Sequence, residues 1–369
     1  MFLPVVKPVV RIVLRIITFI LYFITVLAAY GGRVNPEYMT LPATLTLALP
    51  YFVIASMIAT ALWFCAGRWI TGGIGVAVII AAWSPISTAF PVSFSKNADN
   101  PDRTFRVLTY NILHGLDQEN PEMTEGNRSF RYILDQDADL VGLQELVNID
   151  DKAEVKIEEA LLDSLKMKYP YRAGSPWTSD LKVLSKYPVK LLEESGLFSL
   201  YQIRMPWGKL NWINMHMTSF QLSDEERGVV REIMKDTRQG LQEMKGSIRG
   251  KLSDGFRERA QGARRLREVL DRYPGPMIIS GDLNDVPESY AYRTIRGDEF
   301  ADAYQETSFG PLVTYNRHGF YFHLDQILYR PEFMDALSVT KGRLKSSDHY
   351  PLTAEFEWKQ RDKRQNNNQ

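Results

Sequence analysis

Acids, amides and imidazoles recur beside short apolar runs in the second part of the chain. They stand in the segments Thr109-Tyr110-Asn111, Gly142-Leu143-Gln144-Glu145, Asn214-Met215-His216, Gly281-Asp282-Leu283-Asn284, His323-Leu324-Asp325 and Ser347-Asp348-His349. A buried carboxylate is costly unless it is paired or bound to a cation. If the fold brings these segments together, the sequence predicts a cluster of acids that needs a cation.

The chemistry open to such a cluster is hydrolysis of a phosphate ester. Oxygen ligands of this kind favour Mg²⁺, Mn²⁺ or Ca²⁺ over zinc. The reaction needs an in-line nucleophile, neutralisation of charge on the phosphoryl oxygens and a proton for the leaving group. Carboxylates, amides and imidazoles supply groups for all three tasks.

Each motif taken alone also has an ordinary structural explanation. Asn111 would serve as a strand-end cap, Glu145 as a surface acid, and Asp282 with Asn284 as parts of a turn. His216 alone would be a hydrogen-bonded core histidine. Asp348-His349 would be a helix cap or a local hydrogen-bonded pair. The joint occurrence of the motifs in this order favours the functional interpretation.

In this order the motifs, with Leu108–Ile112 and Leu324-Asp325-Gln326-Ile327, resemble the endonuclease/exonuclease/phosphatase superfamily, which has the deoxyribonuclease-I-like fold. The resemblance covers about residues 103–358. It implies an α/β fold, a two-sheet α/β sandwich, with the site at one end of the two sheets.

The resemblance also implies a role for each acid and amide. Glu145 would be the principal metal ligand, with Asn111 and Asp348 nearby, directly or through water. The cofactor would be Mg²⁺ or Mn²⁺. Asp282 would orient or deprotonate the attacking water, and Asn284 would donate its amide to the phosphoryl group.

Two histidines complete the implied site. His349, held in position by Asp325, would contact the scissile phosphate. His216 would be the second catalytic histidine and the proton donor to the leaving oxygen. No carboxylate partner for His216 is identified from the sequence; Trp177-Thr178-Ser179-Asp180 lies where the family often has a further polar residue, and it stays unassigned.

Alternating short strands and amphipathic helices are predicted from Thr104 onward. The expected strands are Phe105–Ile112, Leu140–Leu146, Phe198–Met205, Asn211–Met217, Met277–Leu283, Leu324–Tyr329 and Leu352–Trp358, and the expected helix is Arg128–Leu134. Ser223–Asp271 is polar with helical spacing and predicts a solvated helical pair, or alternatively a basic lip that engages phosphates. The polar tail, residues 359–369, is expected to be disordered.

Residues 1–95 differ in composition from the rest of the chain, because Glu37 is their only acid and apolar residues dominate. Three stretches, at about residues 12–30, 41–65 and 70–90, are long enough to span a membrane as helices. A cleaved signal peptide is the alternative for the first stretch. The expected organisation is therefore a three-span anchor over 1–95, a linker over 96–103 and a catalytic domain over 104–358.

Positive charges predict the orientation of this anchor. Lys7, Arg11 and Arg15 precede the first stretch, and Arg68 lies between the second and third. Cytoplasmic loops carry such cations, so an odd number of spans places the catalytic domain outside the cytoplasm. The expected location is the inner (plasma) membrane, multi-pass, with a periplasmic or extracellular catalytic domain.

Composition narrows the function without selecting a substrate. The net charge is +0, from 44 basic and 44 acidic residues, which argues against a nucleic-acid coat protein. The expected partners are the lipid bilayer and a phosphate-ester substrate: a lipid headgroup, a small phosphodiester or a nucleic acid. The alternatives are a membrane-bound nuclease and, from another class, a non-catalytic membrane receptor that retains the fold. No protein partner is predicted.

Overall fold

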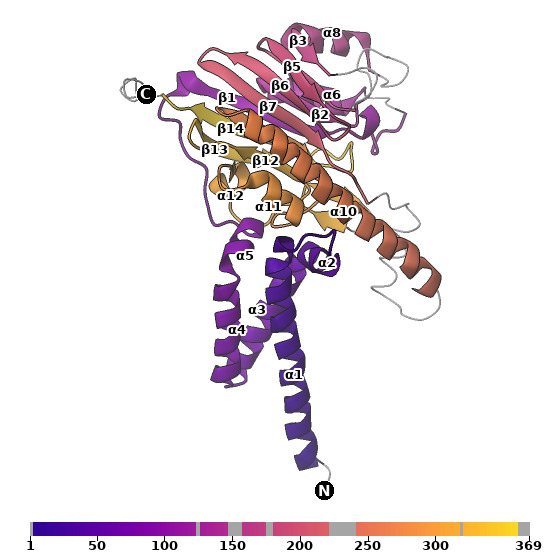
Figure 1. Cartoon of the computed structure of the whole chain (residues 1–369), viewed down its shortest axis with the longest axis vertical. Coiled ribbons are helices and arrows are strands. Elements are labelled where there is room, and N and C mark those ends of the chain that lie inside the picture. The colour runs from indigo at the N-terminus through magenta and orange to yellow at the C-terminus, as the bar shows by residue number, and fades with distance from the viewer. Residues whose placement is uncertain are drawn as a thin grey trace.

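The computed structural model describes residues 3–122, 126–146, 157–174, 180–220, 241–317 and 320–360. It has two parts (Figure 1): a group of N-terminal helices and a larger sandwich of strands and helices that sits at one end of them. The predicted tail lies outside the described residues from position 361 onward.

The first sheet of the sandwich has six strands in the order β13-β14-β1-β2-β4-β3. Their bounds are, in that order, Met334–Lys341, Leu352–Trp358, Thr104–Asn111, Leu140–Gln144, Lys182–Ser185 and Tyr171–Ala173. β1 and β2 run parallel, with Asn111 level with Gln144. The two strands therefore end at the same edge of the sheet.

The second sheet also has six strands, in the order β5-β6-β7-β8-β12-β9. Their bounds are Val189–Glu194, Phe198–Met205, Gly208–His216, Met277–Asp282, Asp325–Tyr329 and Ala301–Asp302. β7 and β8 run parallel with His216 level with Asp282, and β12 runs antiparallel to β8 with Asp325 level with Asp282. Three of the predicted site residues thus lie side by side.

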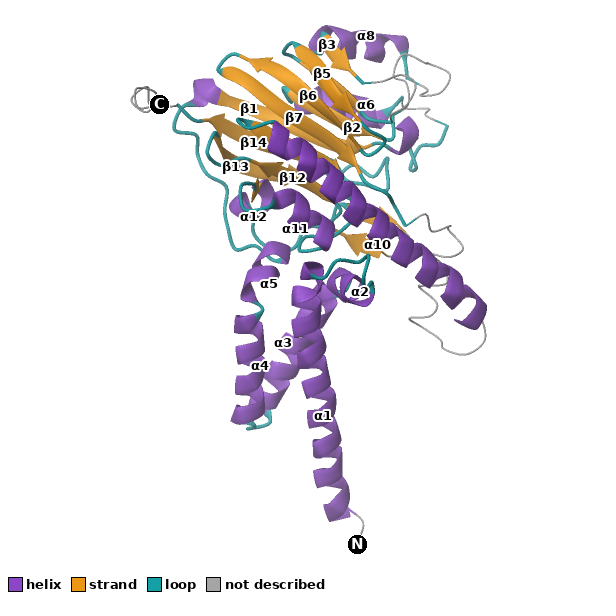
Figure 2. Cartoon of the chain, in the orientation of Figure 1, coloured by secondary structure: helices purple, strands orange, loops and turns teal. Residues whose placement is uncertain are grey.

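A two-stranded hairpin and, within the described residues, five α-helices complete the sandwich. The hairpin is β10 (Tyr315–Arg317) and β11 (Phe320–Phe322). The helices are α6 (Arg128–Gln136), α8 (Glu159–Lys168), α10 (Leu241–Arg272), α11 (Tyr290–Arg296) and α12 (Ala303–Thr307). Figure 2 shows the strands enclosed between helices.

Side-chain alternation along β1 explains this layering. Phe105 and Val107 belong to a buried cluster that includes Trp212 of the second sheet, so they fill the space between the sheets. Leu108 and Tyr110 instead pack in a cluster with residues of α6 and α8. Because successive strand residues point to opposite faces, an apolar strand can serve both layers. The result is a helix–sheet–sheet–helix sandwich, which confirms the predicted fold class.

Residues 223–240 of the segment predicted as a solvated helical pair lie outside the described residues, and the rest of that segment, 241–271, lies in α10. Within the described residues it is one continuous helix, and Ala263, Leu266 and Leu270 are fully buried against the second sheet. Their spacing of three and four residues places them on one helix face. The frequent charges of this segment conceal that apolar stripe.

The N-terminal part consists of α1 (Leu3–Tyr30), α2 (Leu41–Leu47), α3 (Leu49–Cys65), α4 (Trp69–Ala81) and α5 (Trp83–Ala89). Of the helices described, α1 alone is long and apolar enough to cross a membrane by itself. The pairs α2–α3 and α4–α5 are bent by 66° and 68°, and there are up to three spans if each bent pair counts as one.

Proline accounts for the two bends. Pro50 and Pro85 lie in the first turn of α3 and α5, and a proline lacks the backbone N–H that would continue the preceding helix. Buried hydroxyls hold the helices together: Thr25 Oγ1 lies 2.8 Å from Ser56 Oγ on α3. Such contacts suit helices that pack in an apolar medium.

The N-terminal helices pack directly on the sandwich. Thr88 on α5 donates a hydrogen bond to buried Glu288, 2.9 Å long, and Glu37 binds Arg264 on α10 at 2.6 Å. A Cβ added to Gly32 would lie 1.7 Å from the backbone oxygen of Glu288. Only glycine permits this approach, so the chain is closely fitted at the junction between its two parts.

Candidate active site

The ends of β1, β2, β7 and β8 meet at one end of the sandwich. The Asn111 amide joins groups of both sheets there: its Nδ2, at the end of β1, lies 2.9 Å from Glu145 Oε1 and 3.2 Å from Asp282 Oδ2. Parallel strands deliver their last residues to one edge. The strand-end residues that the sequence singles out therefore form one cluster.

Asp282 lies at the centre of this cluster and is 1 % exposed. Asn284 donates two hydrogen bonds to the Asp282 carboxylate. Its backbone N lies 2.7 Å from Oδ1, and its side-chain Nδ2 lies 3.2 Å from Oδ2. Gly281 permits the placement of Asp282, because a Cβ at this position would lie 2.0 Å from Met215 O on β7. The motif Gly281-Asp282-Leu283-Asn284 thus has a structural reason for its glycine.

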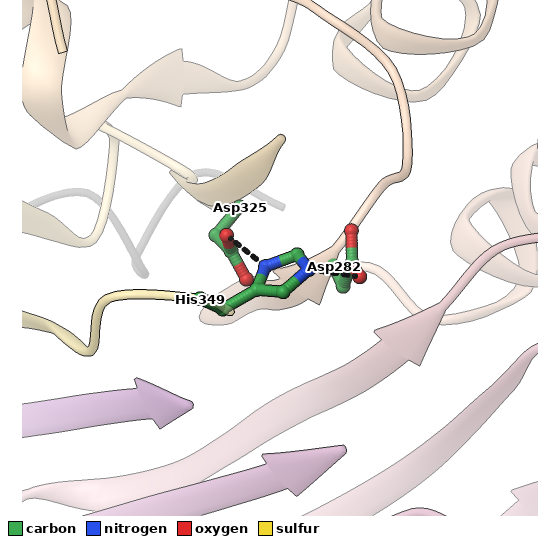
Figure 3. A group of neighbouring side chains, drawn as sticks. All are labelled: Asp282, Asp325 and His349. Atoms are coloured by element: carbon green, nitrogen blue, oxygen red, sulfur yellow. Dashed lines mark hydrogen bonds and ion pairs between the residues drawn. The ribbon is translucent and has the colours of Figure 1, made fainter. Parts of the chain in front are cut away.

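His349 approaches Asp282 from one side, as Figure 3 shows. Its Nδ1 lies 2.8 Å from Asp325 Oδ2, and its Nε2 lies 3.5 Å from Asp282 Oδ2. The bond to Asp325 fixes the ring orientation, so Nε2 faces the centre of the site.

His216 approaches Asp282 in the same way. Its Nδ1 lies 2.7 Å from Asp180 Oδ2, and its Nε2 lies 3.9 Å from Asp282 Oδ2 and 3.7 Å from Glu145 Oε1. Asp180 is therefore the carboxylate partner of His216 that the sequence leaves unassigned. The other residues of that segment, 177–179, lie outside the described residues.

The surroundings of both imidazoles raise their pKa values. Burial by itself lowers the pKa of His216, but its hydrogen bond to Asp180 and the charges of Asp282, Asp180 and Glu145 outweigh burial and raise the pKa to about 9. Burial likewise opposes charge on His349, whereas the charges of Asp325 and Asp282 raise its pKa to about 10. Both rings can hold a proton at neutral pH.

The pKa values of Asp282 and Asp325 are shifted in opposite directions. Burial raises the pKa of Asp282, although the charge of His349 acts against it. Burial also opposes charge on Asp325, but the charge and hydrogen bond of His349 keep its pKa below the usual range. A carboxylate that stays charged beside one that accepts a proton more readily is typical of sites that divide acid and base roles.

Two site residues have strained backbones. Glu145 and Asn284 have positive φ angles of 56° and 54°, although neither is a glycine. Such conformations cost about 1–3 kcal/mol and persist where the surrounding structure enforces them. Glu145 directly follows β2 and Asn284 comes two residues after the end of β8, and both side chains reach the cluster.

Asp348 and His114 lie at the edges of the cluster. The Asp348 carboxylate accepts a hydrogen bond of 3.2 Å from Arg317 on the β10–β11 hairpin. His114, which the sequence interpretation does not include, places Nε2 3.6 Å from Glu145 Oε2. Its position directly after the Asn111 strand was the available signal. The ligand role of Asp348 stays a prediction.

The donor set fits a hard divalent cation in either of two places. Asp282, Asp325 and His349 offer one ligand atom each, all within 4.8 Å of one another. In that group His349 Nδ1 is already hydrogen-bonded to Asp325 Oδ2. Glu145 and Asn111 offer a carboxylate and an amide oxygen, which are ligands that hard divalent cations prefer. We therefore favour the Glu145 side.

Comparison with known proteins agrees with this geometry. Residues 108–349 match the model of the Endonuclease/Exonuclease/phosphatase family, and residues 11–89 match a domain of unknown function. A comparison with curated proteins gave no match.

Several solved structures are similar to the chain at low sequence identity. An endonuclease/exonuclease/phosphatase from Beutenbergia cavernae DSM 12333 is 17% identical, with 69% of this chain and 72% of that chain covered and a TM-score of 0.46. The human Nocturnin catalytic domain is 16% identical, with 71% and 96% covered and a TM-score of 0.43. Sphingomyelinase C from Streptomyces griseocarneus is 17% identical, with 68% and 99% covered and a TM-score of 0.39.

The predicted resemblance is thus confirmed by a family match that includes all six of its motifs. With the strand-end cluster in place, the chain belongs to the endonuclease/exonuclease/phosphatase family of enzymes that act on phosphoric ester bonds.

Proposed function

We propose that the chain is a membrane-anchored, divalent-metal-dependent phosphoesterase that hydrolyses a phosphate mono- or diester by in-line attack of water. The observation that carries this proposal is the arrangement around Asp282, with two carboxylate-bound imidazoles facing one buried acid. The family match supports the reaction class, and the cluster of side chains supports the individual roles.

Asp282 orients the attacking water and accepts its proton. Its burial favours proton uptake, and Asn284 fixes the carboxylate by two hydrogen bonds. The water oxygen bonds to phosphorus as the bond from phosphorus to the leaving oxygen breaks. A positioned base of this kind contributes about 10²–10⁴-fold in rate.

The imidazoles act on the phosphate and the leaving group. His349 Nε2 donates to a phosphoryl oxygen and stabilises the charge that develops there. His216 Nε2 gives its proton to the leaving oxygen, for which a ring that stays protonated at neutral pH is suited. Asp325 and Asp180 hold the two rings in position and stabilise their charge.

Glu145 and Asn111 would hold Mg²⁺ or Mn²⁺, with Asp348 near them or acting through water. When bound, the cation neutralises phosphoryl charge as a Lewis acid. The carboxylate and carboxamide groups of these residues are the oxygen donors that such cations prefer.

The N-terminal helices would anchor the enzyme in the inner (plasma) membrane as a multi-pass protein. α1 is apolar enough to span, and the bent pairs would add two more crossings. Lys7, Arg11, Arg15 and Arg68 would remain cytoplasmic. The sandwich, at the other end of α1 (Figure 1), would then lie in the periplasm or outside the cell.

A substrate panel tests the function. The purified full chain, with Mg²⁺ or Mn²⁺, is offered plasmid DNA, RNA, phospholipid vesicles and bis(4-nitrophenyl) phosphate, each in parallel with His349→Ala. We expect metal-dependent hydrolysis of at least one ester and its loss by about 10²–10⁴-fold in the variant. Asp325→Asn should be milder, because it removes only the support of His349. Hydrolysis of none of these esters would contradict the proposal.

A further inference from the structure

A cavity separate from the candidate active site lies where the N-terminal helices meet the sandwich. It has a volume of about 250 Å³ and is formed by α2, α3 and α5 on one side and by segments 286–287, 311–313 and 321–323 on the other. An apolar cavity of about 150 Å³ is large enough to bind benzene. The cavity between the two parts therefore has room for a piece of an apolar molecule.

The walls of this junction cavity are apolar. Among the described residues that line it there is no Lys, Arg, Asp or Glu, and the set consists mainly of aliphatic, proline and aromatic side chains. Such walls do not provide charges to hold a nucleic-acid backbone, whose binding depends on basic residues. The lining selects an apolar occupant.

The cavity opens toward the surface that would face lipid. Its lining residues Tyr51 and Ile54 on α3 are 53% and 48% exposed, and Tyr321 on the hairpin is 55% exposed. Outside the cavity, α3 continues with Met57 and Ile58, which are also more than half exposed. The opening is thus continuous with an apolar surface of a predicted membrane-spanning segment.

Two residues that line the cavity lie close along the chain to groups of the candidate active site. Val313 and His323 line the cavity, and the residues two positions further along the chain are Tyr315 and Asp325. Two residues of chain span at most about 7 Å. The Tyr315 ring packs edge-on against His349, with ring centroids 5.1 Å apart, and Asp325 binds the same histidine. Two short pieces of chain, 313–315 and 323–325, therefore connect the cavity lining to groups that contact His349.

We propose that the junction cavity binds an acyl chain of a bilayer lipid and that the substrate is the phosphate ester of such a lipid. This inference rests on the proposed phosphoesterase function. A bilayer lipid joins the two chemistries that the structure places side by side: an apolar chain for the cavity and a phosphate ester for the cluster around Asp282. The N-terminal helices then contribute to substrate binding as well as to anchoring.

Substitutions that fill the cavity with a larger side chain should block lipid binding without changing the catalytic residues. Ala89→Phe fills it from α5, and Val313→Phe fills it from the sandwich. Ala77→Phe is the matched control, because Ala77 is exposed on α4 and does not line the cavity. None of the three positions belongs to the site around Asp282.

The first measurement uses the full chain in vesicles of phosphatidylethanolamine and phosphatidylglycerol, with a trace of phosphatidylglycerol that carries a photoactivatable diazirine in its acyl chain. After irradiation, peptide mass spectrometry should find label in segments 49–54, 311–313 and 321–323. Both filling variants should reduce that label by about tenfold or more, since displacing two methylene groups already costs about that much in affinity. Ala77→Phe should label like the wild type. Equal labelling of all four proteins in these segments would overturn the cavity assignment.

The second measurement compares kcat/KM for vesicle phospholipid with kcat/KM for bis(4-nitrophenyl) phosphate. The filling variants should lose about tenfold or more on the lipid and keep wild-type hydrolysis of the soluble ester, which also shows that they are folded. Cleavage of plasmid DNA without hydrolysis of vesicle lipid would overturn the substrate class and leave the phosphoesterase proposal standing. Hydrolysis of no ester would refute the phosphoesterase proposal itself, while the labelling still decides what the cavity binds.

Discussion

Asp180 Oδ2 lies 2.7 Å from Nδ1 of His216. Asp325 and His349 repeat this arrangement at 2.8 Å, and the Nε2 atoms of both rings face Asp282. The site thus has two carboxylate–imidazole pairs around one acid. Because the pairs differ in what their Nε2 atoms would contact, they can be tested separately.

Replacing Asp180 should move the pH dependence of activity. His216 must be protonated to act as an acid, and its pKa of about 9 places the alkaline loss of activity near that pH. Asp180→Asn removes a charge that raises this pKa, so the alkaline limb of kcat/KM should shift to lower pH. Activity should fall more at pH 8 than at pH 6. Asp298→Asn, at an exposed position, is the control. An unmoved alkaline limb would show that His216 does not govern it.

Replacing His216 should have an effect that depends on the leaving group. His216→Ala removes the proposed proton donor, so hydrolysis of an alkyl ester with a poor leaving group should fall by about 10²–10⁴-fold. A nitrophenyl ester, whose leaving oxygen needs no proton, should be affected least. Turnover of both esters by the variant and the wild type is the measurement. Equal losses on the two esters would assign His216 to phosphate binding instead.

Much of the sandwich could be predicted from local patterns. Phe198–Met205 and Leu352–Trp358 are strands with the predicted bounds, because alternating or continuous apolar runs of this length are characteristic of buried strands. β13 and β4 were not predicted. Their pairing with β14 and β2 gives them a structure that their own short, mixed sequences do not signal.

The candidate site likewise contains residues that could be predicted from the sequence and residues that could not. Acids and histidines at strand ends could be found from the sequence, since their types alone mark them. Asp180 could not be assigned to His216, because 36 residues separate them and only the folded sheets bring them together. The strained backbone of Glu145 likewise follows from tertiary structure and not from residue type.

The junction between the N-terminal helices and the sandwich should be sensitive to one methyl group. Gly32→Ala places a Cβ 1.7 Å from Glu288 O and should destabilise the protein by about 1–3 kcal/mol, because closely packed backbone must move apart. Gly73→Ala, which meets nothing within 4 Å in α4, should be neutral or stabilise by about 0.5–1 kcal/mol. Thermal unfolding of both variants in detergent is the measurement. Equal melting temperatures would mean that the two parts are not packed together.

The orientation in the membrane should place both the sandwich and the C-terminus outside the cytoplasm. The physical reason is the cytoplasmic preference of Arg11, Arg15 and Arg68 across an odd number of spans. A reporter that is active only after export, fused at Gln369, should be active, and one that is active only in the cytoplasm should not. The reverse pattern would invert the topology and the proposed location.

The central claim is that Asp282 and a divalent cation together hydrolyse a phosphate ester at the cluster between the two sheets. The most direct measurement is hydrolysis of bis(4-nitrophenyl) phosphate by the full chain and by Asp282→Asn, with Mg²⁺ or Mn²⁺ and again in excess EDTA. The wild type should be active with metal, inactive with EDTA and restored by added cation, while Asp282→Asn should retain the fold and lose about 10²–10⁴-fold in turnover. Full activity of the wild type in EDTA, or of Asp282→Asn with metal, would contradict the account.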